Sequence, residues 1–170
     1  MKTIIFPGYS PHNKEWAHWV KKELKLNHEI LVYEWQHWTS GKDMFIREEK
    51  ESALALIGNE RANIIAKSVG TRVVMHIAPI AKDNFEKVIL CGIPSKMGNE
   101  ETKKLYQTGL KLLKPENTIV FQNEKDPFAS YEMIKTFVAS VTPRIEVVKK
   151  ERSDHDYPYA SEFQEFLSGE

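Results

Sequence analysis

The chain of 170 residues is 41% hydrophobic and 28% charged, which is the composition of an ordinary globular protein. Lysine plus arginine and aspartate plus glutamate both number 24, so the formal net charge is zero and a broad cationic surface for nucleic acid is excluded. No apolar run approaches the length of a membrane span, and the first apolar run reaches a loop too soon for a signal peptide. The single cysteine, Cys91, cannot form an internal disulfide. We therefore expect one cytoplasmic domain over residues 1–170, with no membrane partner.

Short apolar runs rich in β-branched residues recur along the chain. They predict strands over residues 3–6, 29–34, 63–67, 87–91, 118–122 and 144–149. Several of these runs are continuously apolar, as is typical of strands whose two faces are both buried. The sequence therefore predicts a sheet that is covered on both sides.

Segments with helical spacing separate these strands. One stripe consists of Trp16, Trp19, Val20 and Leu24, and a second consists of Val69, Val73, Val74, Ile77 and Ile80. Further helices are predicted over residues 44–58, 100–113, 130–140 and 159–167. Regular alternation of strands and helices implies parallel strands joined by right-handed crossovers. The predicted fold is a three-layer α/β/α sandwich around a six-stranded parallel sheet.

The most informative segment is the end of the third strand. There the chain reads Ala66-Lys67-Ser68-Val69-Gly70 and passes at once into a helical pattern. A serine between small residues at this junction is typical of a nucleophile elbow, in which a sharp turn presents the hydroxyl above the sheet. The N–H of Val69, at the start of the helix, is expected to point into the same space and to stabilise an oxyanion. The alternative is that Ser68 is only a helix N-cap.

Candidate acid and base residues follow later strands. Asp126 comes just after the fifth predicted strand and His155 just after the sixth, so the three residues occur in the order Ser68, Asp126, His155. In a parallel sheet the loops at the carboxyl ends of the strands share one edge and form the ligand site. These side chains are therefore expected to converge.

These motifs resemble those of small serine hydrolases of the α/β-hydrolase superfamily. The residues that carry the resemblance are the loop around Pro7-Gly8-Tyr9, the Ser68 elbow, Asp126-Pro127 and His155. Within the superfamily, the chain resembles more closely the compact group that includes YdeN and retinoblastoma-binding protein nine. The resemblance implies a minimal hydrolase fold without a lid. It also implies that Ser68 is the nucleophile, His155 the base and Asp126 the acid, with the N–H groups of Tyr9 and Val69 as the oxyanion hole. The departure is Ala66, where the superfamily usually has glycine.

Each assignment has a competitor. Glu124 is a second acid near Asp126, and five other histidines compete with His155, namely His12, His18, His28, His37 and His76. Those histidines lie within predicted helices, at the wrong end of the sheet, or before the nucleophile in sequence. Asp154 and Asp156 flank His155 but lack metal-ligand spacing with other residues, so no metal and no organic cofactor are expected.

The residues around the predicted site give less information about the substrate. Ser10 is a candidate pocket residue, and Trp35 and Trp38 either form an aromatic pocket wall or cover the core. Lys67 either attracts anionic substrates or is solvated or paired locally. We predict a serine hydrolase that cleaves small carboxylic esters, or alternatively amides, through an acyl-enzyme. The competing functions are an interaction protein on the same fold, although no feature indicates a protein partner, and a flavodoxin-like nucleotide binder, although no phosphate-binding loop follows the first strand.

Overall fold

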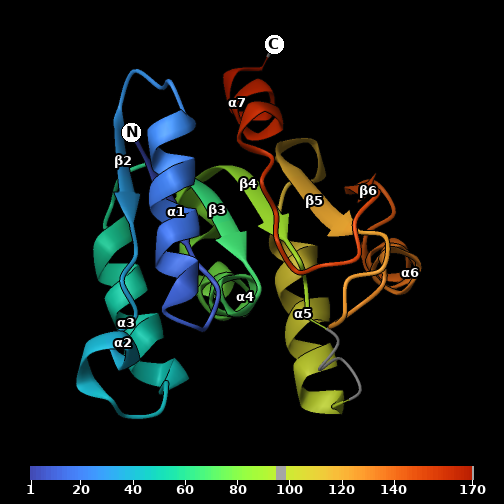
Figure 1. Cartoon of the computed structure of the whole chain (residues 1–170), viewed down its shortest axis with the longest axis horizontal. Coiled ribbons are helices and arrows are strands. Elements are labelled where there is room, and N and C mark those ends of the chain that lie inside the picture. The colour runs from blue at the N-terminus through green and yellow to red at the C-terminus, as the bar shows by residue number, and fades with distance from the viewer. Residues whose placement is uncertain (95–98, 170) are drawn as a thin grey trace.

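A computed structural model describes residues 1–94 and 99–169 of the chain (Figure 1). Six parallel strands form one sheet in the order β2-β1-β3-β4-β5-β6. The strands are β1 (Lys2–Phe6), β2 (Glu29–Val32), β3 (Ala62–Lys67), β4 (Phe85–Cys91), β5 (Thr118–Asn123) and β6 (Glu146–Lys150). The prediction of a six-stranded parallel sheet is confirmed, and most strand ends differ from the predicted ones by one or two residues.

Helices connect the strands in the expected places. They are α1 (His12–Glu23), α2 (His37–Ser40), α3 (Ile46–Ile57), α4 (Val69–Ala81), α5 (Glu100–Leu112), α6 (Tyr131–Val141) and α7 (Ala160–Ser168), with single 3-10 turns at η1 (Lys82–Asn84) and η3 (Pro115–Asn117). The short helix α2 was not predicted, because four residues cannot show a helical period. It ends at Gly41, whose φ of 66° is the left-handed conformation that glycine adopts without strain.

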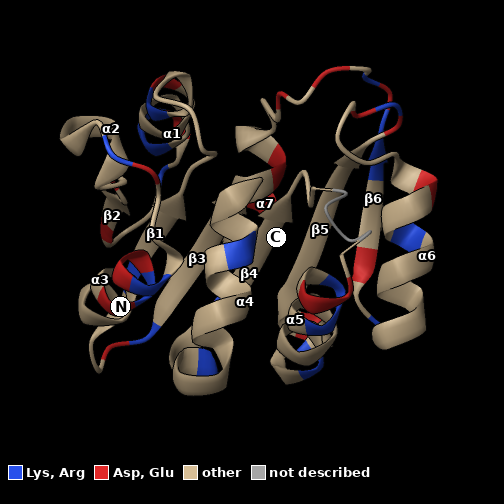
Figure 2. Cartoon of the chain, turned by 90° about the horizontal axis from the view of Figure 1, so that it is seen from below, with Lys and Arg blue, Asp and Glu red and all other residues tan. Residues whose placement is uncertain are grey.

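The sheet separates two apolar cores. On one face, Ile4, Phe6 and Ile64 pack with α3, α4, α5 and α6. On the other face, Ile5 and Ile65 pack with α1 and α7. Figure 2 shows the row α3, α4, α5 and α6 along one side of the sheet and α1 on the opposite side, with positive and negative residues interspersed along the helices. Successive residues of one strand therefore point into different cores, and the predicted three-layer sandwich is confirmed.

Two residues of the predicted helical stripes do not face a core. Trp19 is 37% exposed and Ile80 is 61% exposed. A smaller residue of the same helix is buried, namely Ala17 in α1 and Ala81 in α4. The face of each helix that contacts the core therefore contains fewer of the predicted residues.

Within the described residues, no helix is both long and apolar enough to cross a bilayer.

The strand order reverses direction beside β1. The chain passes from β1 outward to β2 and then returns to β3 on the other side of β1. Such a switch point leaves a crevice between the loops at the carboxyl ends of the two adjacent strands, since their connections run in opposite directions. The loop that follows β1 and the residue that follows β3 therefore meet at this edge of the sheet.

Candidate active site

Ser68 occupies a strained turn between β3 and α4. Its φ of 54° and ψ of −117° make it the single non-glycine residue with positive φ in the described part of the chain. The turn is held by its own N–H, which donates to the carbonyl of Cys91 at 2.9 Å, and by Thr71, whose hydroxyl donates to the carbonyl of Ser68 at 2.6 Å. The Ser68 hydroxyl makes no capping hydrogen bond to α4. The backbone therefore exposes this hydroxyl instead of using it as an N-cap.

The small residue after the elbow is required by close backbone approach. A Cβ at Gly70 would collide with the carbonyl oxygen of Phe6 and lie 2.9 Å from that of Pro7. Helix α4 therefore begins almost in contact with the end of β1. Ala66, where the superfamily usually has glycine, is fully buried at the end of β3 and accommodates its methyl group there.

His155 is hydrogen-bonded to Asp126 across the loops that follow β6 and β5. Its Nδ1 lies 2.6 Å from Oδ2 of Asp126. A carboxylate can only accept, so Nδ1 carries the proton and Nε2 of the neutral ring is left as an acceptor. Nε2 is shielded from solvent and has no hydrogen-bond partner among the described residues. The structure brings His155 and Ser68 to the wall of one cavity without a hydrogen bond between them.

Asp126 is surrounded by donors. Oδ2 also accepts from the hydroxyl of the fully buried Tyr157 at 2.6 Å, and Oδ1 accepts from the N–H of Phe128 at 2.8 Å. Burial alone would raise the pKa of Asp126, but the hydrogen bonds from His155, Tyr157 and Phe128 together lower it below its ordinary value. The competing acid, Glu124, is directed elsewhere, with its carboxylate 3.2 Å from Nζ of Lys149.

Asn123 holds the loop that carries His155. Its side-chain amide donates to the carbonyl oxygens of Asp154 and Asp156, each at 2.8 Å, so it binds the backbone on both sides of the histidine. Asn123 is fully buried, and its Oδ1 accepts from the hydroxyl of Tyr159. This clamp was not predicted from the sequence. Its local signal is a polar residue at the end of β5, after the apolar residues 119–121.

Gly92 makes room for the imidazole. It follows β4 with a φ of 59°, and a Cβ there would lie 2.8 Å from Cε1 of His155 and 2.6 Å from Cε2 of Tyr157. The two rings therefore pack directly against the backbone at the end of β4.

The loop after β1 is anchored by aromatic residues that follow β2. Nε1 of Trp35 donates to the carbonyl of Gly8 at 3.0 Å. Nε1 of Trp38 and Nε2 of His37 both donate to the carbonyl of Tyr9 at 2.8 Å. Because the Gly8–Tyr9 peptide is trans, its N–H points away from the carbonyl that Trp35 binds. In the described part of the chain, the N–H groups of Tyr9 and Val69 donate no hydrogen bond.

A cavity of about 530 Å³ lies over these loops. Its wall includes Ser68, His155, Tyr9 and Ser10. Most of the remaining wall is apolar and includes Met44, Ile46, Val69, Pro94, Tyr106 and Phe128. Trp35 and Trp38 are not among the described residues that line it. Trp35 is 1% exposed and packs in the core against Phe6 and Tyr33, so of the two alternatives for Trp35 the structure supports core packing.

Lys67 is buried beside the elbow and is paired. Its Nζ donates to Oδ1 of Asn13 at 2.8 Å, lies 3.6 Å from a carboxylate oxygen of Asp156, and sits 5.3 Å from the ring centre of Trp16. Burial lowers the pKa of Lys67, although Asp156 opposes that shift. The alternative of local pairing is therefore the one that the structure supports for Lys67.

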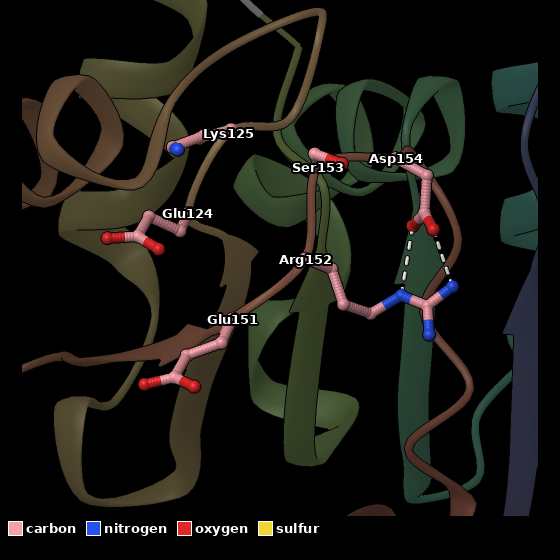
Figure 3. Close-up of a pocket in the computed structure, with 6 residues that line it drawn as sticks. All are labelled: Glu124, Lys125, Glu151, Arg152, Ser153 and Asp154. Atoms are coloured by element: carbon pink, nitrogen blue, oxygen red, sulfur yellow. Dashed lines mark hydrogen bonds and ion pairs between the residues drawn. The ribbon is translucent and has the colours of Figure 1, made fainter.

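A second hollow lies at the loops that follow β5 and β6, and all of its lining residues are polar or charged. Figure 3 shows its six lining residues, with the Arg152 guanidinium bonded to the Asp154 carboxylate. Among the described residues, no group of three or more His, Cys, Asp or Glu side chains has the arrangement of a metal site. Neither observation adds a reactive group to the site around Ser68.

The chain has the α/β-hydrolase fold, and solved structures with this fold match it over nearly its whole length. No protein-family model matches the sequence. No curated protein matches it by sequence. The mouse alpha/beta hydrolase domain-containing protein 10 superposes with a TM-score of 0.71 at 13% identity, covering 99% of this chain and 88% of that one.

Bacterial structures give similar results. The ydeN gene product of Bacillus subtilis superposes with a TM-score of 0.71 at 12% identity, covering 98% of each chain. An α/β serine hydrolase without a lid from Xanthomonas campestris gives 0.66 at 12% identity, covering 99% of this chain and 79% of that one. The predicted resemblance to YdeN is thus confirmed as a likeness of fold. At such identities the activity has to be argued from the site.

Proposed function

We propose that this chain is a serine hydrolase that cleaves small carboxylic esters through an acyl-enzyme. The observation that carries the proposal is the paired His155, whose Nδ1 is bound by Asp126 and whose Nε2 has no partner among the described residues, in the same cavity as the strained Ser68 turn. A serine hydroxyl is activated as a nucleophile by an adjacent base that accepts its proton, and we assign this role to Nε2 of His155.

The reaction divides into two acyl transfers. Ser68 Oγ attacks the ester carbonyl while Nε2 of His155 takes the hydroxyl proton, and the carbonyl oxygen becomes an oxyanion. The tetrahedral intermediate collapses, the bond to the leaving alkoxide breaks, and His155 returns the proton to that oxygen. Water then repeats the sequence on the acyl-enzyme, which releases the carboxylic acid and free Ser68. Asp126 keeps the imidazole in the required tautomer and stabilises its protonated form.

The N–H groups of Tyr9 and Val69 are proposed as the oxyanion hole. Neither donates a hydrogen bond within the described residues, and Val69 is the first residue of α4, where the helix dipole favours negative charge. An amide substrate would use the same groups, but its poorer leaving group makes an ester the expected substrate class.

Covalent labelling tests the proposal directly. A fluorophosphonate probe should form a single adduct on Ser68 of the wild-type protein, because an activated serine attacks the phosphorus and displaces fluoride. Intact mass and peptide mapping measure the adduct, and folded Ser68→Ala provides the control without the hydroxyl. A well-folded wild-type protein that takes no label would contradict the proposal and favour an interaction protein on this fold.

The Trp35 indole provides a second test, directed at the oxyanion hole. Trp35→Phe removes the hydrogen bond that fixes the Gly8–Tyr9 peptide and keeps most of the buried ring volume. We expect kcat to fall about tenfold with little change in KM, because the Tyr9 N–H is needed most when the oxyanion forms. Steady-state kinetics on a para-nitrophenyl ester measures this split.

Trp38→Phe is the matched control. It removes an indole hydrogen bond from the same loop, but from the carbonyl of Tyr9, which His37 also binds. We expect a smaller effect on kcat. Equal losses in the two variants would show that Trp35 acts only through the stability of the loop, and thermal unfolding of both variants measures that contribution.

A further inference from the structure

Arg72 is the one arginine or lysine among the described residues that line the cavity, and no aspartate or glutamate lines it there. Apolar residues such as Met44 and Phe128 make up much of the remaining wall. A guanidinium in such a wall has an electrostatic preference for negative charge that water screens less than on an open surface. The cavity is therefore biased toward an anionic occupant.

The Arg72 guanidinium has no partner within residues 1–94 and 99–169. It makes no ion pair and no hydrogen bond there, and its Nε is shielded from solvent without an acceptor. Other arginines are used differently, since Arg47 pairs with Glu51 and Arg152 with Asp154. A buried donor without an acceptor is unfavourable, so an acceptor supplied from outside the chain would be bound with a gain.

Groups next to Arg72 do not neutralise it. Tyr106 also lines the cavity, but burial raises the pKa of its hydroxyl, which is hydrogen-bonded to Thr71. That phenol therefore stays neutral and provides no counter-charge. The other cation near the nucleophile, Lys67, is already paired with Asp156. The available positive charge in the cavity belongs to Arg72.

The position of Arg72 sets the geometry of an occupant. It lies in the first turn of α4, three residues and about 4.5 Å along the helix axis after Val69, which directly follows Ser68. Arg72 and Ser68 both line the cavity, so both border the space that an occupant would fill. The N-terminus of α4 adds a favourable dipole for negative charge.

We propose that the substrate is an ester whose acyl part carries a second, anionic group, a carboxylate about one helical turn from the scissile carbonyl, and that Arg72 binds this carboxylate. The inference rests on the proposed hydrolase function, because it names the class of ester that the same cavity takes. Arg72 contacts the substrate away from the reacting atoms, and the apolar wall contacts the chain that joins the carboxylate to the carbonyl.

A matched pair of esters tests the selectivity. Mono-para-nitrophenyl adipate carries a free carboxylate, and its methyl ester replaces that charge with one additional methyl group. We expect wild-type kcat/KM to favour the charged ester by about tenfold or more, mainly through a lower KM, since the guanidinium–carboxylate contact is made in the ground state as well as in the transition state. Arg72→Gln should abolish this preference and Arg72→Lys should restore part of it.

Arg144→Gln is the matched control for charge. Arg144 is an exposed arginine just before β6, at the opposite end of the sheet, so its removal should leave the preference at the wild-type value. Salt dependence gives a second readout, because the preference should fall as ionic strength rises.

Binding separates this inference from the hydrolase proposal. Monomethyl adipate is titrated calorimetrically into Ser68→Ala and into Ser68→Ala combined with Arg72→Gln. A wild type that hydrolyses both esters equally well would overturn the anionic substrate and leave the hydrolase intact. Absence of hydrolysis with binding that requires Arg72 would overturn the hydrolase and support the anion site. Absence of both hydrolysis and binding would overturn both.

Discussion

Ser68→Ala should lower kcat/KM for a para-nitrophenyl ester by about 10⁴-fold or more, to a residual rate that the oxyanion hole and substrate binding alone provide. The expected loss is this large because no other described hydroxyl occupies the strained turn between β3 and α4. The substitution keeps the Cβ and removes an oxygen that makes no capping hydrogen bond. The free energy of unfolding should therefore change by less than about 1 kcal/mol. Steady-state kinetics and thermal unfolding measure the two quantities on the same preparation.

A double variant extends this experiment. Ser68→Ala combined with His155→Ala should lose little more than either single variant, because nucleophile and base act as one unit. Turnover near the wild-type rate in Ser68→Ala would refute the assigned nucleophile. Additive losses would indicate that His155 acts outside the triad.

Asp126→Asn should lower kcat by about 10³- to 10⁴-fold, because an amide in place of the carboxylate no longer enforces the tautomer with the proton on Nδ1. The site makes the substitution severe, since the carboxylate accepts from His155, Tyr157 and Phe128 while an amide has a single acceptor oxygen. One buried donor would then face the amide NH₂ group, which costs about 1–3 kcal/mol of stability.

The matched control for the acid is Glu124→Gln. Glu124 is partly exposed and paired with Lys149, so its substitution should leave kcat close to the wild-type value. A large loss in Glu124→Gln together with a small loss in Asp126→Asn would show that Glu124, and not Asp126, is the acid.

The stability of the fold should also depend on pH through Asp126. The ionised Asp126 stabilises the fold above its unfolded pKa, and this contribution is lost as the pH falls through its lowered folded value.

The sheet and most helices could be predicted because apolar periodicity is a local property of the sequence. Residues 63–67 were predicted as a buried strand from their apolar β-branched residues, and the strand extends one residue further at Ala62. The edge strand β2 is shorter than predicted, because its ladder to β1 ends where Ile5 pairs with Val32. The residues at which strands begin and end depend on the neighbouring strands with which they pair, and the local sequence does not contain that information.

The residues that arrange the site were harder to predict than the elements. Trp35 was expected to line a pocket or cover the core, and its bond to Gly8 joins positions that are 27 residues apart. Asn123 and Tyr157 were not identified, since their contacts with the loops of His155 and Asp126 arise only after β5 and β6 are placed side by side. Arg72 had a local signal that was overlooked, namely its place in the first turn of the helix that directly follows Ser68.

Gly92 has a consequence for attempts to change the chemistry of this site. Every other amino acid would introduce a first side-chain carbon into the volume that the imidazole and phenol rings occupy. A designer who wished to exchange His155 for a larger base would find free volume on the cavity side but none beneath the ring. Gly92, directly after β4, thus limits the space beneath the imidazole of His155, and remodelling has to proceed from the cavity side.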